Sequence, residues 1–280
     1  MPTFTEVDEK LAPKTKQKRP RTKKKEVDEF SCKLDLPSGF SPYDFKELYV
    51  RPLTVLEVKK LQPIINGKAT GISLANAISG AASMRLDQLT FGDFWFVSAW
   101  LRLNTFPNAP FGMKWTCPKC GRANVTNLDL ASLDIVELAE EYKEPATVTL
   151  PNGEKVPLRL NRVEHQDLVE DFAKALHKTD SPTEEEMFIP SLAITVANGQ
   201  SLFSNVELLS SDKYTPEDLN IIASFQDTFS HGLPRYTSAT CGGEGGCDSN
   251  VNRLRLDFRI HDIVPVNGYR GYLRDNIQFG

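Results

Sequence analysis

The chain has 280 residues, of which 40% are hydrophobic and 25% are charged, the composition of an ordinary globular protein. This length can form one large core or two modest ones. No apolar run approaches the length of about 18 residues that crosses a bilayer, and the N-terminus lacks a signal-peptide core. The composition therefore argues against a membrane protein.

The first part of the chain, residues 1–29, is expected to form a basic arm. The net charge of the chain is −4, and subtracting +9 for residues 10–25 leaves about −13, so the body is acidic. The arm is either a solvated, disordered tail or a segment that becomes ordered on an acidic partner, protein or nucleic acid. Its nine basic residues are Lys10, Lys14, Lys16, Lys18, Arg19, Arg21, Lys23, Lys24 and Lys25.

Helices are predicted in the segment that follows. Residues 30–50 contain prolines and glycine and are expected to be an irregular lead-in that ends in a short strand or extended segment at 48–53. Thr54 and Glu57 form a capping-box pattern that opens a helix. Apolar residues recur at helical spacing over residues 72–86. The segment 90–103 begins with another capping pattern and is apolar nearly all round, which predicts a helix at the centre of the core.

A pair of cysteines follows this helix. Cys117 and Cys120 are separated by two residues and followed by glycine, the pattern of a zinc knuckle, in which a tight turn points both sulfurs inward. A tetrahedral zinc ion needs two more ligands, and Cys241 and Cys247 offer them after a loop of about 120 residues. Four thiolates would close the site and leave no position for a substrate. The pattern therefore predicts a structural zinc ion.

The second cysteine pair leaves alternatives open. Five residues separate Cys241 from Cys247, and four of them are glycine, so the loop can bend to bring both sulfurs round. A local disulfide between these two cysteines, or unpaired thiols, are the other interpretations. His231 is an alternative ligand, and Glu244 could act as a general base only if the site were open. Cys32 has no evident partner and is expected to be a small buried thiol, and a reducing compartment fits this cysteine usage.

The rest of the chain alternates between predicted strands and helices. Asn152-Gly153 supplies the tight turn of the clearest hairpin. The strand at 251–260 is expected to turn Arg253, Arg255, Asp257 and Arg259 outward and to pair beside the strand at 124–130. The remaining expected elements are a helical turn at 133–141, hairpin strands at 146–150 and 154–160, a helix at 164–178, a helical piece from 183 that Pro190 interrupts, and a helix from 215.

Together these elements predict an α+β fold in three parts. The basic arm is residues 1–29. The body, residues 30–262, contains helical segments and short antiparallel strands around a zinc-ribbon-like site. Residues 263–280 carry aromatic side chains and are expected to be a docking extension. No nucleophile elbow, phosphate loop or dinucleotide-binding motif is present, and the four histidines form no metal-ligand pair, so no enzymatic activity is expected.

The order and spacing of these motifs over residues 45–260 resemble the baseplate hub and hub-assembly proteins of contractile-tailed, T-even-type phages. In that family the second cysteine pair has the two-residue spacing, from which this chain departs. The motifs that carry the resemblance are Leu53-Thr54-Val55-Leu56-Glu57, Leu89-Thr90-Phe91-Gly92-Asp93-Phe94-Trp95-Phe96, Trp100-Leu101-Arg102-Leu103, Trp115-Thr116-Cys117-Pro118-Lys119-Cys120-Gly121, Leu128-Asp129-Leu130, Thr149-Leu150-Pro151-Asn152-Gly153 and the late cysteine pair before a strand.

The resemblance implies a structural or assembly subunit in the hub or wedge region of a tail baseplate. Its partners would be other baseplate, hub and tail-tube proteins, and it would reside in the virion after assembly in the host cytoplasm. A second hypothesis is a zinc-ribbon nucleic-acid-binding protein that uses the basic arm and the outward arginines. The acidic body argues against this second hypothesis.

Overall fold

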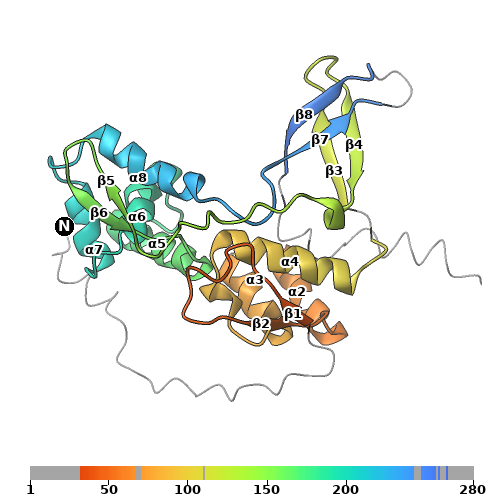
Figure 1. The fold of residues 1–280 in the computed structure, drawn as a ribbon, viewed down its shortest axis with the longest axis horizontal. Helices are drawn as coiled ribbons and strands as arrows, with labels where there is room; N and C mark the ends of the chain where they lie inside the picture. Colours follow the sequence, from red (N-terminus) through yellow and green to blue (C-terminus); the bar gives the residue numbers. More distant parts are fainter. Residues whose placement is uncertain are drawn as a thin grey trace, which may run out of the picture.

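Two helical lobes and a pair of projecting hairpins make up the described part of the protein (Figure 1). The computed structural model describes residues 32–66, 71–109, 111–242, 247–256, 258 and 263. Within these residues there are seven α-helices and four antiparallel two-stranded sheets, which confirms the predicted α+β class. None of the described helices is long and apolar enough to cross a membrane. The basic arm and nearly all of the docking extension lie outside the described residues.

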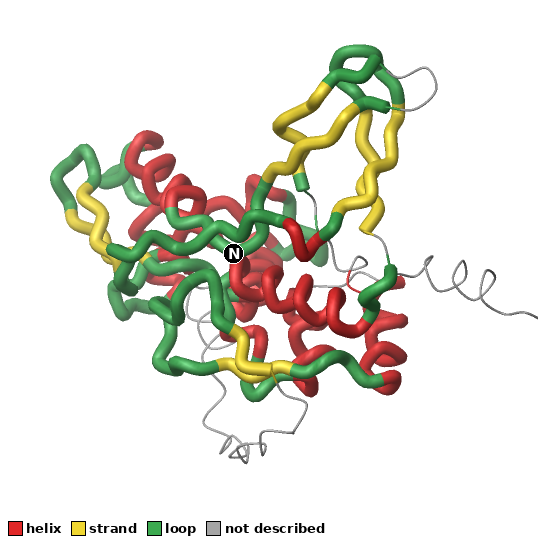
Figure 2. The backbone as a smooth tube through the Cα atoms, turned by 45° about the vertical axis from the view of Figure 1, so that its right-hand side comes forward, coloured by secondary structure: helices red, strands yellow, loops and turns green. Residues whose placement is uncertain are grey.

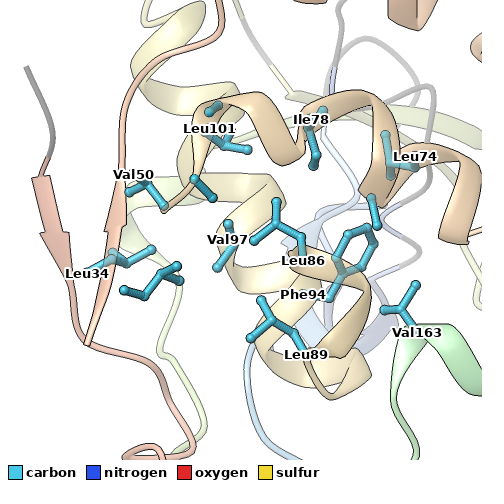
Figure 3. Packing of buried hydrophobic residues seen from close by; sticks show 14 of the residues in the cluster. Leu34, Val50, Leu74, Ile78, Leu86, Leu89, Phe94, Val97, Leu101 and Val163 are labelled. Carbon is cyan, nitrogen blue, oxygen red and sulfur yellow. The ribbon is translucent and has the colours of Figure 1, made fainter. Parts of the chain in front are cut away.

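The first lobe is built around α4, which is central to the core as its apolar sequence predicts. Figure 3 shows Phe94 and Val97 of this helix among Leu86, Ile78 and Val50 from neighbouring segments. All five side chains are almost completely buried. The elements of this lobe are β1 (Cys32–Leu34), β2 (Leu48–Val50), α2 (Val55–Asn66), α3 (Gly71–Ile78) and α4 (Phe91–Thr105).

The second lobe has a separate core, in which the largest fully buried side chains are Tyr142 and Phe172. Its hairpin is the one that Asn152-Gly153 predicts, and Gly153 has the positive φ of +84° that the turn requires. The elements are β5 (Ala146–Thr149), β6 (Lys155–Leu158), α5 (Val163–His177), α6 (Glu184–Thr195), α7 (Leu202–Leu209) and α8 (Pro216–Thr228).

Local side-chain caps fix where several helices begin. The Thr54 hydroxyl accepts from the Glu57 N–H at 3.3 Å, while the Glu57 carboxylate accepts from the Thr54 N–H at 2.8 Å. At the start of α5, the ring nitrogen Nδ1 of His165 accepts from the Arg162 N–H at 3.1 Å. Burial and the two nearby arginines, Arg159 and Arg162, lower the pKa of His165 to about 3, so the ring stays neutral and can accept this bond.

The structure differs from the expected elements of the two lobes in several places, and one is that α3 ends at Ile78, before the expected end of the helix at residue 86. The strand expected from residue 48 is present as β2, but it pairs with the unexpected strand β1, so that Cys32 lies opposite Val50. Residues 133–141 form no helix, and only a 3-10 turn at Leu130–Ser132 precedes them. Helix α7 was not expected. Pro190 lies inside α6 and does not interrupt it, because the buried packing of that helix outweighs the loss of one backbone hydrogen bond.

A buried polar cluster holds the start of α4 against the segment before β2. The Tyr43 hydroxyl donates to Asp93 Oδ2 at 2.6 Å and accepts from the Thr90 N–H at 2.8 Å. Asp93 Oδ1 accepts from the Ser38 N–H at 3.1 Å. Asp93 is fully buried, so these hydrogen bonds replace the water that the carboxylate loses on folding. Burial and the adjacent carboxylate raise the pKa of Tyr43, which keeps its hydroxyl protonated as a donor.

Removing the Tyr43 hydroxyl should therefore destabilise the protein. Tyr43→Phe leaves the Thr90 N–H and one Asp93 oxygen without this partner, and we expect a loss of about 1–3 kcal/mol in the free energy of unfolding. Urea denaturation followed by circular dichroism measures it. Tyr49→Phe is the matched control, because its hydroxyl donates to Glu47 at the surface, and it should change stability by less than about 0.5 kcal/mol. Equal effects of the two substitutions would contradict the role of the buried cluster.

Candidate metal centre

Two hairpins face each other and stand apart from the helical lobes (Figures 1 and 2). The first pairs β3 (Phe111–Thr116) with β4 (Ala123–Leu128), and the second pairs β7 (Tyr236–Thr240) with β8 (Asn250–Arg255). We call these two hairpins the ribbon. The expected pairing of the strand at 251–260 with the strand at 124–130 is therefore wrong. Each strand pairs with its own hairpin partner, because that pairing needs only a local turn.

The hairpins share a small core of their own. Trp115 from the first hairpin packs with Ala239 and Leu254 from the second. The indole Nε1 of Trp115 donates to Thr126 Oγ1 at 2.9 Å, which satisfies the polar atom of this buried ring. Cys117 and Cys241 belong to the same cluster and are almost completely buried. The cysteines thus complete a core that is too small to hold two hairpins together by itself.

The turns of the ribbon bring the four predicted ligands together. The sulfurs of Cys117, Cys120, Cys241 and Cys247 all lie within 4.8 Å of one another. The sulfurs of Cys117 and Cys247 are 3.7 Å apart, and those of Cys120 and Cys241 are 3.6 Å apart. A tetrahedral ion with metal–sulfur bonds of about 2.3 Å sets its ligands about 3.8 Å apart. The cluster therefore has the dimensions needed to hold a metal ion with four sulfur ligands.

The same geometry decides between the interpretations of the second cysteine pair. All five cysteines are free thiols in the structure, so Cys241 and Cys247 do not form a local disulfide. Two sulfur contacts, at 3.6 and 3.7 Å, join one hairpin to the other. The cluster thus links segments that are 121 and 130 residues apart along the chain.

The first turn is held by backbone hydrogen bonds. The Cys117 N–H donates to the Arg122 carbonyl at 2.8 Å, and the Gly121 N–H donates to the Cys117 carbonyl at 2.9 Å. Gly121 has a φ of +73°, a conformation that glycine adopts without steric cost. These two bonds close a tight loop that points both sulfurs to the same side.

The second turn repeats this arrangement although it is three residues longer. The Cys241 N–H donates to the Ser249 carbonyl at 2.9 Å, and the Asp248 N–H donates to the Cys241 carbonyl at 2.8 Å. Asp248 directly follows the second cysteine, as Gly121 does, and has a φ of +51°. Aspartate is among the few residues other than glycine that adopt this conformation readily. The departure from two-residue spacing therefore leaves the knuckle geometry unchanged on either side of residues 243–246, which the structure does not describe.

Hydrogen bonds also prepare individual sulfurs to ionise. The Ser249 hydroxyl lies 3.0 Å from the Cys247 sulfur, and bonds from this hydroxyl and the Ser249 N–H lower the pKa of Cys247 to about 6. The backbone N–H groups of Cys120 and Lys119 lower the pKa of Cys117. The Arg122 N–H acts on Cys120 in the same direction, but the Cys247 sulfur and burial outweigh it and raise the pKa of Cys120 to about 11. Four adjacent thiols thus resist losing all their protons unless a cation balances the charge.

The base of the ribbon is attached to the first lobe by apolar contacts. Phe111, Leu130 and Leu256 form a small buried cluster there. The Phe258 ring lies 5.5 Å from that of Phe111 and 5.8 Å from that of Trp95 on α4. The Arg102 guanidinium is buried and lies over the Phe111 ring at 5.6 Å. Four small contacts thus set the orientation of the ribbon on the body.

Three other candidate residues have different outcomes. His231 is not part of the metal cluster, because its Nε2 lies 2.7 Å from Thr90 Oγ1 and its Nδ1 lies 3.0 Å from the Phe229 carbonyl. Glu244 lies outside the described residues. Cys32 was expected to be buried, but it is exposed on β1, where the short edge strand leaves its side chain facing outward.

Sequence reasoning missed residues that support the ligands. Ser249 supplies a hydroxyl to Cys247, and the Asn124 amide nitrogen lies 3.6 Å from the Cys241 sulfur. The position of Ser249, two residues after the last cysteine, is a signal that could have found it, because Arg122 occupies the equivalent place after Cys120. Compared with known proteins, the chain matches no family model, no curated protein and no solved structure. The metal centre is therefore assigned from its own geometry.

Replacing a ligand should abolish metal binding and loosen the ribbon. For Cys117→Ser we expect about one metal ion per chain to be lost, because three thiolates and a hydroxyl bind a soft tetrahedral ion far more weakly. Elemental analysis by mass spectrometry measures the metal, and hydrogen exchange should show faster exchange in 111–128 and 236–256 than in the two helical cores. Cys32→Ser is the matched control and should retain the metal. A fully metal-loaded, protected Cys117→Ser ribbon would refute the assignment.

Proposed function

We propose that the four cysteines bind a structural zinc ion and that the protein is a structural or assembly subunit of a phage tail baseplate. The observation that carries the proposal is the closed set of four sulfurs, which joins two hairpins that are about 120 residues apart in the chain. Zinc favours tetrahedral thiolate sites of this kind, and such closed sites stabilise folds rather than bind substrate. An iron ion is the competing occupant of a four-sulfur site, and elemental analysis separates the two.

The baseplate role is supported by the resemblance of the motif order to T-even-type baseplate hub and hub-assembly proteins, and by the architecture. The ribbon projects from the helical body (Figure 2). If a metal ion holds its two hairpins together, the ribbon presents a surface of fixed shape to neighbouring proteins. Such a role needs binding surfaces and a stable shape, and it needs no reactive site. The partners would be other baseplate, hub and tail-tube proteins of the virion, assembled in the host cytoplasm, and an acidic surface for the arm at residues 10–25.

Cross-linking mass spectrometry of phage particles and of their tail-assembly intermediates tests this role. We expect the chain in one or both samples, with cross-links from Lys114 or Lys119 on the ribbon to baseplate, hub or tube proteins. Lysates made without the protein should lack complete baseplates. A cross-link map that contains only non-tail proteins, or normal baseplates without this chain, would rule out the role while leaving the metal centre intact.

A second function, nucleic-acid binding by the ribbon, is favoured by one observation. Lys114, Lys119, Arg253 and Arg255 are exposed on the ribbon, and the basic arm would add to their charge. Against it, the rest of the chain is acidic, and the Arg253 guanidinium already lies over the Tyr236 ring at 4.9 Å. We therefore consider protein partners the better supported class.

Salt-dependent binding to duplex DNA and single-stranded RNA separates these two functions. If the protein is a baseplate subunit, the Kd for either nucleic acid at 150 mM salt should be no tighter than the non-specific range of about 1–100 µM. A nucleic-acid-binding protein would instead show an affinity that falls steeply between 50 and 200 mM salt and is lost on removal of residues 10–25. Fluorescence anisotropy with labelled oligonucleotides measures both quantities, and the second result would favour the alternative.

A further inference from the structure

A cleft lies where the base of the ribbon meets the ends of two helices. It has a volume of about 840 Å³ and is bordered by the start of α4, the end of α8 and the strands β7 and β8. This volume is within the range of about 300–1,000 Å³ in which proteins bind ligands and peptide side chains. The cleft is separate from the four sulfurs, since no cysteine lines it.

The lining of the cleft is rich in partly exposed aromatic rings. Phe91, Trp95, Phe229 and Phe258 all line it and are neither buried nor fully exposed. Tyr236 stands at the same cleft with 48% of its surface exposed. Covering these partly exposed rings would bury apolar surface, which is favourable. The lining of the cleft therefore suits a segment with large apolar side chains.

Charge adds a second requirement on the ligand. Two arginines line the cleft, and Arg235 pairs with Asp227 at 2.5 Å. Arg255, which lies opposite Tyr236 in the β7–β8 register, has no carboxylate partner among the residues that the structure describes. A ligand that places a carboxylate beside its apolar side chains would satisfy this guanidinium.

We propose that the segment at residues 264–280 of the same chain docks in this cleft. It lies outside the described residues, and its sequence carries one carboxylate, Asp275, among large apolar side chains. We infer that Asp275 pairs with Arg255 while the apolar side chains cover the aromatic lining. After Asn267-Gly268, the large apolar side chains of the segment are Tyr269, Tyr272, Leu273, Ile277 and Phe279.

The course of the chain makes this docking sterically accessible. Phe258 lines the cleft, and Ile263, only five residues later, is fully buried in the core of the first lobe. The 17 residues that follow can span up to about 58 Å when extended, and Asn267-Gly268 is a strong turn sequence that can send the chain back. A short tether also gives millimolar effective concentrations, so docking needs only modest affinity.

A nucleic acid fits the same cleft less well. Asp227 stands at its edge, and Val136, which also lines it, is flanked by the exposed acidic residues Asp134 and Glu137. These carboxylates would repel phosphates. A protein segment that carries both signs of charge, as this one does with Arg270, Arg274 and Asp275, has no such conflict.

Site-specific photo-cross-linking in the full-length chain tests the proposal. Phe279 is replaced by the photoreactive residue benzoylphenylalanine, and cross-linked peptides are identified by mass spectrometry. We expect cross-links to 91–95 and 229–236, within one chain. Arg255→Asp should lower their yield by at least about fivefold, and adding Asp275→Arg should restore it, because the swap recreates the ion pair. Lys155→Glu, a charge reversal at an exposed residue outside the cleft, is the control and should leave the yield unchanged.

Each other outcome overturns the proposal. Cross-links to surfaces outside the cleft would place the segment elsewhere. Cross-links that join chains in a mixture of ¹⁴N- and ¹⁵N-labelled protein would show that a second copy supplies the segment. An unchanged yield in Arg255→Asp, or a failure of the swap to restore it, would exclude the ion pair. The proposal does not depend on the baseplate role, so it can succeed or fail independently of that role.

Discussion

The ribbon depends on the convergence of four sulfurs from two distant turns. A two-stranded hairpin is at best marginally stable alone, and the apolar core that Trp115, Ala239 and Leu254 share is small. Four thiols this close together resist losing all their protons unless a cation balances the charge, so the cluster is suited to a metal ion that would hold the two hairpins together. A metal ion bound by these four sulfurs would join the two hairpins, as a large core joins the elements of each helical lobe.

A close backbone contact fixes the segment that leads from the body into β7. The backbones of Gly92 and Gly232 approach so closely that a Cβ on Gly232 would lie 2.3 Å from the Gly92 carbonyl oxygen. His231, next to this contact, meets the cap of α4 through Thr90. The chain entering β7 is thus held against the helix that forms the centre of the first lobe. Since β3 follows the same helix along the chain, α4 contacts the segments that lead into both hairpins.

Much of this could be predicted from the sequence where a local rule applies. The four ligands follow from residue type and spacing. The caps at Thr54, Thr183 and Thr215 follow from a hydroxyl three residues before a carboxylate. Strand β7 could not be predicted, because Tyr236–Thr240 lacks an alternating apolar pattern and is fixed by its partner β8 and the sulfur cluster. Which strands pair is a long-range property that the periodicity of a single segment does not encode. Pro190 is a different case, in which the packing of α6 outweighs the local tendency of proline to end a helix.

Because the lobes and the ribbon have separate cores, the ribbon can open without unfolding of the lobes. The two lobes and the ribbon each bury their own cluster, and the apolar contacts between the ribbon and the first lobe centre on Phe111, Leu130, Leu256 and Phe258. Local opening therefore requires the loss of few apolar contacts, so metal loss need not unfold the helices. The cleft lies at this same junction, lined by Trp95 of the lobe and by Tyr236 and Arg255 of the ribbon. A segment bound in the cleft would contact the first lobe and the ribbon at once and would bury apolar surface at the junction between them. Docking in the cleft and metal binding in the turns would therefore stabilise the same orientation of the ribbon.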